Sequence, residues 1–353
     1  MATSTDEEIL SQILNEINEK GTTKIEPTIP IQEVSEKVVL EGQVEYSTVF
    51  GKSFTGISHP VTVFKKKDWH KDLQMFIPKS NPNYVFQPEA TEKMVVAIEL
   101  GDKSMITGPT GSGKSTLIKE ICARLNRPFI RINMTGDMDS GAFFGQYLIE
   151  DGATVWKNGP MAEGALHGAV VLIDEWELSP PEITMGLQWL LEDDGELYLK
   201  EKAGDSKDKI IQPHNQFRIV CGGNTLGQGD ETGAHAGVNV QNTASIDRFQ
   251  TVCKLDYLTK SHELNILKKA VPTLNADIAD KMLQFASLLR QGYKQGSVSL
   301  TMSPRTLINW AKKTTYWGDP LVALKMAFFD KISENEKPEV NQIVTKVFTK
   351  PIK

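Results

Sequence analysis

A run of glycines, a lysine and a serine has the spacing of a phosphate-binding loop. Residues 108–116 read Gly-Pro-Thr-Gly-Ser-Gly-Lys-Ser-Thr, which fits the pattern Gly-x4-Gly-Lys-Ser/Thr. Glycines let the backbone curl so that successive N–H groups converge on a phosphate at a helix N-terminus, where the helix dipole favours negative charge. In this chemistry Lys114 would reach the β- and γ-phosphates of ATP, and the Ser115 hydroxyl would hold Mg²⁺.

The residues around this run favour a true loop over a chance glycine-rich turn. An apolar stretch from Ser104 to Thr107 comes directly before it, and Leu117, Ile118 and Ile121 follow at helical spacing. Strand, loop and helix in this order are the context that the motif needs.

Two adjacent carboxylates follow a second apolar run, Ala169-Val-Val-Leu-Ile-Asp174-Glu175. The run is typical of a strand buried on both faces, and its carboxyl end is where ligands bind in open parallel sheets. Asp174 would position Mg²⁺ through its coordinated water, and Glu175 would polarise an attacking water. The alternative is a strand that ends in a solvated acidic turn, and the phosphate loop upstream argues against it.

These two motifs predict a nucleotide site with a metal. The predicted metal residues are Ser115 and Asp174. The predicted residues for the cofactors ATP and Mg²⁺ are Gly108, Pro109, Thr110, Gly111, Ser112, Gly113, Lys114, Ser115, Thr116 and Asp174.

Three further residues could take part in catalysis together with Glu175. Asn224 ends the buried run that starts at Phe217, so it could orient the attacking water, although two preceding glycines also suit an ordinary turn asparagine. Arg248 stands between an acid and Phe249, an aromatic that would anchor it. Arg305 falls in the first turn of a helix with Ser303 as N-cap and Pro304 at its first position, where it could point back at phosphate.

The composition describes a globular chain. It has 353 residues, is 40% hydrophobic, and carries a net charge of −6, which argues against a general nucleic-acid binder. The three cysteines lack ligand-like spacing and predict buried thiols in a reducing compartment. A polar, acidic beginning and the lack of any run near 18 apolar residues predict a cytoplasmic protein without membrane insertion.

The periodicity predicts an α/β fold with a parallel sheet flanked by helices. A hairpin is expected around Asp151-Gly152, and a longer one joins 196–199 to 210–211. Short β-like runs are expected at 44–49 and 60–64. Helical patterns without strands from Asp256 onward predict a helical lid.

We therefore expect four regions. Residues 1–24 form an amphipathic helix and a flexible tether, and residues 25–77 form a small accessory region. Residues 78–255 form the nucleotide-binding α/β domain, and residues 256–353 form the helical lid.

The order of these motifs resembles that of AAA+ ATPases, and the two hairpins resemble those of the MoxR-type branch. The segments 224–233 and 302–311 are similar to those of the ATPase subunits of aerobic cobaltochelatases. The resemblance covers about residues 77–336. It implies a P-loop AAA+ core and a homo-oligomeric, hexameric ring. In such a ring Arg248 is an arginine finger that reaches a neighbouring subunit, and Arg305 is the second sensor in the lid.

The resemblance also implies partners, namely a von Willebrand A-type protein and a large chelatase-like subunit that holds the tetrapyrrole. Two roles stay open, cobalt insertion into a corrin-type ring and MoxR-like remodelling of protein or nucleic-acid partners. Nothing in the sequence indicates nucleic acid. The histidines at 59, 70, 167, 214, 235 and 262 are isolated in the sequence, so we expect no cobalt site in this chain.

Overall fold

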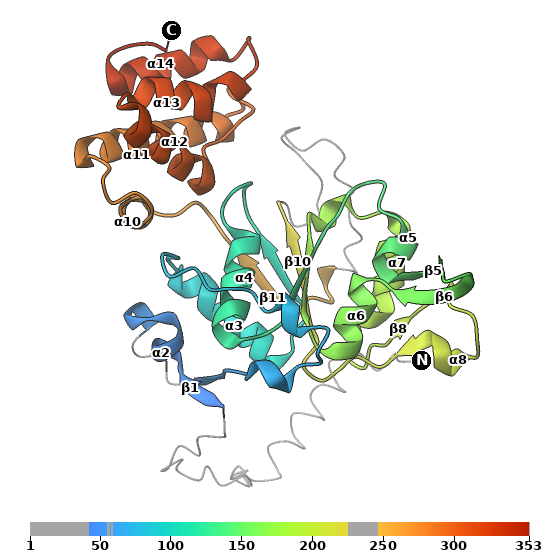
Figure 1. Ribbon diagram of the computed structural model, residues 1–353. Helices are drawn as coiled ribbons and strands as arrows, with labels where there is room; N and C mark the ends of the chain where they lie inside the picture. The colour runs from blue at the N-terminus through green and yellow to red at the C-terminus, as the bar shows by residue number, and fades with distance from the viewer. Residues whose placement is uncertain (1–41, 55–56, 58, 225–245, 353) are drawn as a thin grey trace, which may run out of the picture. The chain divides into compact units, whose positions relative to one another are not determined.

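A parallel sheet built from apolar runs organises the chain. The computed structural model describes residues 42–54, 57, 59–224 and 246–352. Five strands pair in the order β11-β3-β10-β7-β4, and every pairing is parallel (Figure 1). The strands are β3 (Ser104–Thr107), β4 (Phe129–Asn133), β7 (Val170–Asp174), β10 (Arg218–Gly223) and β11 (Thr251–Lys254). Every residue of β3, β7 and β10 is buried, as expected for central strands covered on both faces.

The register brings the predicted site residues to one edge of the sheet. Asp174 lies beside Asn133 on one side and Gly222 on the other. Thr107, the last residue before the phosphate loop, pairs with Gly223 and Lys254. Since all five strands run in the same direction, their carboxyl ends form a single polar rim.

Alternating side chains of the strands enter two separate cores, one on each face of the sheet. On one face, Val170 and Leu172 of β7 pack against α3 (Pro88–Leu100) and α4 (Lys114–Leu125). On the other face lie α6 (Pro160–His167) and α7 (Pro181–Gln188), with the short α5 (Ser140–Phe144) and η5 (Trp189–Leu191) nearby.

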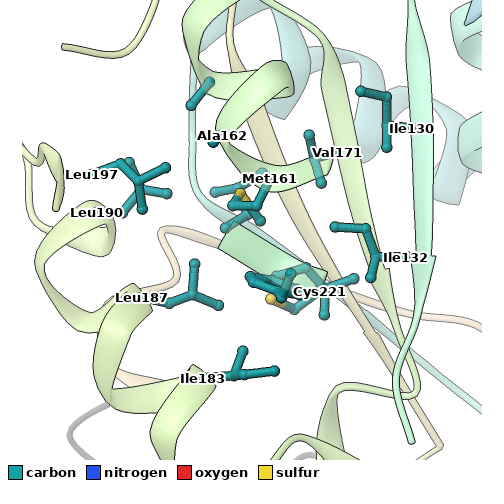
Figure 2. Packing of buried hydrophobic residues seen from close by; sticks show 14 of the residues in the cluster. Ile130, Ile132, Met161, Ala162, Val171, Ile183, Leu187, Leu190, Leu197 and Cys221 are labelled. Atoms are coloured by element: carbon teal, nitrogen blue, oxygen red, sulfur yellow. The ribbon is translucent and has the colours of Figure 1, made fainter. Parts of the chain in front are cut away.

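Figure 2 shows the second of these cores. Ile132 of β4, Val171 of β7 and Cys221 of β10 face Met161 of α6 and Ile183 of α7. All five side chains are almost completely buried. Cys122, Cys221 and Cys253 are free and buried, as the sequence predicted.

Both predicted hairpins are present. The first joins β5 (Gly145–Glu150) to β6 (Ala153–Asn158), and its turn residues Asp151 and Gly152 have φ of 51° and 81°, the left-handed values that a tight hairpin turn requires. The second joins β8 (Leu197–Tyr198) to β9 (Ile210–Ile211), with α8 (Ser206–Lys209) in its loop. The Tyr147 hydroxyl of the first accepts a hydrogen bond from the Ala203 N–H of the second, at 2.7 Å.

The accessory region departs from its prediction in one place. β1 (Gln43–Glu45) and β2 (Pro60–Thr62) pair antiparallel, but residues 46–49 of the β-like run expected at 44–49 belong to the helix α2 (Tyr46–Phe50). Helical spacing lets the rings of Tyr46 and Phe50 both pack into the core that also contains side chains of α3 and α4, with their centroids 4.7 Å apart. This packing overrides the β propensity of the segment. The 3-10 turns η1 (Lys52–Phe54), η2 (Lys66–Asp68) and η3 (Gln74–Phe76) complete the region.

Described residues from 256 to 352 contain helices and no strand. They are α10 (Lys260–Ala270), α11 (Ala276–Lys294), α12 (Pro304–Trp317), α13 (Pro320–Ala327) and α14 (Lys337–Phe348), and the 3-10 turn η6 (Phe329–Lys331) lies between α13 and α14. Another 3-10 turn, η4 (Trp176–Leu178), follows β7 in the α/β part of the chain. Trp310, Phe285 and Leu289 are fully buried in a core of their own.

Within the described residues, no helix is both long and apolar enough to cross a bilayer. The helix predicted within residues 1–24 and residues 225–233 of the segment 224–233 lie outside the described residues. The four region boundaries stay predictions.

Candidate functional site

The phosphate loop adopts the conformation that its glycines were expected to permit. Gly108 and Gly111 have φ of 149° and 77°. A Cβ at Gly108 would stand 2.3 Å from the Leu255 carbonyl oxygen, and one at Gly111 would stand 2.4 Å from the Ser303 Cβ. Neither position can accept a side chain without displacing its neighbours, so both glycines are required by this geometry. The helix α4 begins directly afterwards, at Lys114.

Lys114 is held between the loop and the end of β10. Its Nζ donates to Gly108 O at 2.7 Å and to Asn224 Oδ1 at 2.8 Å, and the side chain is buried. Burial lowers the pKa of the Lys114 ammonium, whereas the charges of Asp174, Glu177 and Glu175 act in the opposite direction. The ammonium is thus fixed beside three carboxylates and an amide.

Asp174 receives hydrogen bonds from both sides. The Ser115 hydroxyl donates to its Oδ2 at 2.5 Å, and Arg131 Nε donates to the same oxygen at 2.7 Å. Hydroxyl and carboxylate oxygens are the ligands that Mg²⁺ prefers, so the donor set present here fits the predicted ion.

Glu175 follows in an uncommon backbone conformation. Its φ of 58° and ψ of 42° are left-handed, which is rare outside glycine, asparagine and aspartate and is found at functional sites. The residue lines the same pocket as Lys114 and Ser115. The turn therefore presents two successive carboxylates at the edge of the sheet.

The structure brings three of the four predicted catalytic residues to one pocket. Glu175, Asn224 and Arg305 all line it, and Arg305 stands in the first turn of α12, behind the predicted cap formed by Ser303 Oγ and Thr306 N–H. Arg248 does not line it. Its Nε instead donates to Glu192 Oε1 at 2.7 Å, while Phe249 is buried against Trp176.

The pocket has a volume of about 490 Å³, within the usual range for small-molecule sites. One part of its wall, here called the phosphate-loop lining, consists of residues 110–116, Arg131, Asp174, Glu175, Gly223 and Asn224. A second part, here called the apolar lining, consists of Tyr84, Val85, Leu258, Ile266, Ala270 and Ile308. The rest of the wall consists of Asn81, Asn83, Gln87, Ser303, Pro304 and Arg305.

Sequence reasoning missed the whole apolar lining, as well as Arg131. A signal for Arg131 was available, because Phe-Ile-Arg-Ile-Asn alternates apolar and polar residues and sets Arg131 apart from its buried neighbours Ile130 and Ile132. The apolar lining comes from three distant segments. Although Ile308 lies in the segment 302–311 that carries the resemblance, no local pattern marks these residues as parts of one wall.

The segment that carries Tyr84 and Val85 is tied to the phosphate-loop helix. Glu120 of α4 accepts a hydrogen bond from Asn81 N–H at 3.0 Å, and Arg124 donates to Asn81 O at 2.9 Å. The two side chains also pair with each other at 2.8 Å. Glu120 is buried, so this ion pair is shielded from solvent and fixes the start of the segment.

The histidines are less isolated than the sequence suggested. The rings of His70 and His167 stack with their centroids 4.1 Å apart, because the segment after η2 passes over the last turn of α6. His214 is nearby, and desolvation, followed by the charges of His167 and Arg218, lowers its pKa. In the described part of the chain, no group of three or more His, Cys, Asp or Glu side chains could hold a metal ion.

Two families match successive parts of the chain. Residues 103–249 match the AAA domain (dynein-related subfamily), and residues 263–350 match the CbbQ/NirQ/NorQ C-terminal family. The aerobic cobaltochelatase subunit CobS of a Sinorhizobium species is 31% identical, covering 77% of this chain and 83% of that protein. Protein CbbQ of Hydrogenophilus thermoluteolus is 24% identical over 74% of this chain and 92% of its own length.

A solved structure also aligns with most of the chain. The Holliday junction branch migration motor RuvB of Thermotoga maritima aligns with 78% of this chain and 80% of its own. It has 17% sequence identity and a TM-score of 0.46.

Proposed function

The chain belongs to the MoxR-type branch of the AAA+ ATPases, and on that premise we propose that its pocket binds Mg²⁺-ATP and hydrolyses it in a ring of identical subunits. The observation that carries this proposal is the hydrogen-bonded set of Lys114, Ser115, Asp174 and Asn224 within one pocket. Such a set combines a phosphate-binding ammonium, two hard oxygen donors and a water-orienting amide.

Each residue has a distinct task in the proposed reaction. Lys114 exchanges its contacts with Gly108 O and Asn224 Oδ1 for oxygens of the β- and γ-phosphates. Glu175 accepts the proton of the water that attacks the γ-phosphorus, while the bond from that phosphorus to the ADP oxygen breaks. Asn224 orients this water, and Arg305 contacts phosphate from the lid.

Ser115 and Asp174 would hold the magnesium ion. When bound, Mg²⁺ neutralises charge on the phosphate oxygens. The base of the nucleotide would contact the apolar lining, where aromatic and aliphatic side chains offer contact to its faces.

Arg248 would complete the site of a neighbouring subunit in a hexameric ring. Its guanidinium lies outside the pocket of its own chain and pairs with Glu192, and both side chains are partly exposed. A partly exposed arginine outside the pocket of its own chain is placed where a neighbouring subunit could reach it. We place this ring in the cytoplasm, which suits its free thiols.

Two clients fit this motor. The similarity to CobS, a cobaltochelatase subunit, favours a role in cobalt insertion into a corrin-type ring, together with a von Willebrand A-type protein and a large chelatase-like subunit. The match of residues 263–350 to the CbbQ/NirQ/NorQ family favours the alternative, remodelling of a protein partner. Fold and ancestry do not fix the client.

The test has two stages. Purified protein is expected to release phosphate from ATP only with Mg²⁺, and Lys114→Ala is the inactive control. Tagged Glu175→Gln protein is then loaded with ATP and its co-purifying proteins are identified, with Lys114→Ala as the matched bait. Recovery of both chelatase-type partners supports cobalt insertion, whereas a different stoichiometric partner supports remodelling. Absence of hydrolysis by the wild-type assembly would refute the ATPase proposal.

A further inference from the structure

A third acidic residue near the pocket belongs to no motif. Glu177 lies in η4, two residues after Glu175, and is only 2% exposed. Its Oε1 accepts a hydrogen bond from the Asn224 backbone N–H at 2.6 Å. The contact joins the turn after β7 to the end of β10, where the water-orienting amide stands.

The second carboxylate oxygen of Glu177 lowers the stability of the folded protein. Oε2 is buried and has no hydrogen-bond partner among the described residues. Burying a carboxylate with an unsatisfied oxygen is unfavourable, and an apolar side chain of similar size would fill this position without that cost. A buried acid kept at such a place therefore calls for a functional explanation.

Glu177 is linked to the phosphate-binding lysine through Asn224. The backbone of Asn224 donates to Glu177, while its side-chain Oδ1 accepts from Lys114 Nζ at 2.8 Å. A charged acceptor makes the backbone contact short and directional. Holding the backbone of Asn224 leaves its side chain free to exchange Lys114 for another partner without moving the strand end.

We propose that Glu177 is a positioning residue that holds the Asn224 backbone, so that the Asn224 amide can orient the attacking water. This inference rests on the proposed ATPase activity, and it adds a residue that does not itself touch nucleotide. Its action depends on reach, because the carboxylate must span from η4 to the Asn224 N–H.

Two conservative variants separate reach from charge. Glu177→Gln keeps the length and an acceptor oxygen but loses the charge, whereas Glu177→Asp keeps the charge but is one methylene shorter. Positioning predicts that Glu177→Asp loses kcat by on the order of 10²-fold. Glu177→Gln should lose much less, because its side-chain oxygen still reaches the Asn224 N–H, although as a weaker, neutral acceptor. A purely electrostatic role predicts the reverse order.

The double variant Glu177→Asp/Asn224→Ala completes the experiment. Its kcat should equal that of Asn224→Ala alone, because residues that act through one another do not give multiplying losses. ADP affinity and the unfolding temperature should stay at wild-type values in Glu177→Asp. The exposed acid Glu182 of α7 offers a matched control, and Glu182→Ala should leave kcat unchanged.

If the wild-type protein hydrolyses ATP, three results would contradict the role of Glu177 while leaving the proposed ATPase activity intact. They are a wild-type kcat in Glu177→Asp, losses that multiply in the double variant, and a loss of ADP affinity equal to the loss of kcat. A wild-type assembly that hydrolyses no ATP would instead overturn the proposed function, and the inference with it.

Discussion

The phosphate-loop lining is made by one strand-turn-helix unit and the ends of adjacent strands, whereas the apolar lining is assembled from three segments far apart in the chain. In the first, hydrogen bonds from Lys114 and Ser115 fix the polar groups before any ligand arrives. In the second, Ile266 and Ile308 depend on the packing of the C-terminal helices. The phosphate-loop lining should therefore supply most of the affinity, and the apolar lining should tune it.

The sharpest test of this difference is Lys114→Ala. The variant should lose measurable binding of ATP and ADP by calorimetry, because in the proposed reaction the ammonium contacts phosphate already in the ground state. Glu175→Gln is the matched comparison and should keep binding but lose turnover, since the role proposed for Glu175 is on the attacking water. An equal loss of ATP affinity in both variants would contradict these roles.

A second test concerns Arg248, which belongs to neither lining. Arg248→Ala should lower the rate by about 10³–10⁵, the range for arginine fingers in related nucleotidases. If Arg248 serves a neighbouring subunit, mixing inactive Arg248→Ala with inactive Lys114→Ala should restore part of the activity. A mixed ring can then place an intact phosphate site opposite an intact arginine. With co-assembly confirmed by size, no recovery at any mixing ratio would leave Arg248 acting within its own chain.

The difference between a lining made by adjacent motifs and a lining assembled from distant segments also explains which features could be predicted from the sequence. Buried strands, the phosphate loop and both hairpins follow local rules, so β7, its carboxylates and the Asp151-Gly152 turn were predicted correctly. Asn224 and Arg305 line the pocket, at a strand end and behind a helix cap, and their catalytic roles stay predictions.

The features that the sequence did not predict depend on contacts between segments that are distant in the chain or on packing into a shared core. Tyr46 and Phe50 form a helix because both rings pack on one core, which local β propensity does not register. The stack of His70 on His167 and the hydrogen bond of Glu177 to Asn224 join residues far apart in the chain. The apolar lining is of the same kind.

A third test acts on the apolar lining through Arg124. Removing its contact with Asn81 O should loosen the segment that carries Tyr84 and Val85. Loss of a charge-assisted hydrogen bond of about 1.5 kcal/mol would weaken ATP binding roughly tenfold in Arg124→Ala. Tripolyphosphate, which has no base, should bind as before.

Lys119 provides the control for this test, because it is an exposed cation on the same helix. Lys119→Ala should bind both ligands as the wild type does. A parallel loss of tripolyphosphate affinity in Arg124→Ala would show that the ion pair supports the phosphate loop itself.

The smallest loss of nucleotide affinity is expected for Tyr257, which contacts Thr110 of the phosphate-loop lining and precedes Leu258 of the apolar lining. Its hydroxyl donates to Thr110 O of the phosphate loop at 3.1 Å and lies 3.1 Å from Thr301 Oγ1, which precedes α12. Its ring faces the Arg290 guanidinium at 4.3 Å, and that guanidinium is paired with Glu263. Tyr257→Phe keeps this ring contact and removes only the hydroxyl. Loss of one neutral hydrogen bond, about 0.5–1.5 kcal/mol, should weaken ADP binding about two- to tenfold.

Binding of tripolyphosphate, which has no base, shows whether the Tyr257 hydroxyl acts on the phosphate loop or on the part of the site that holds the base. Because the Tyr257 hydroxyl contacts the backbone of Thr110 and is not among the residues proposed to contact phosphate, Tyr257→Phe should leave tripolyphosphate affinity unchanged. The exposed Tyr316 of α12 supplies the control, and Tyr316→Phe should bind ADP normally. Equal losses for ADP and tripolyphosphate would mean that the Tyr257 hydroxyl shapes the loop, and the two linings would then not be energetically separate. A loss confined to ADP would show that the Tyr257 hydroxyl acts through the part of the site that holds the base and does not shape the phosphate loop.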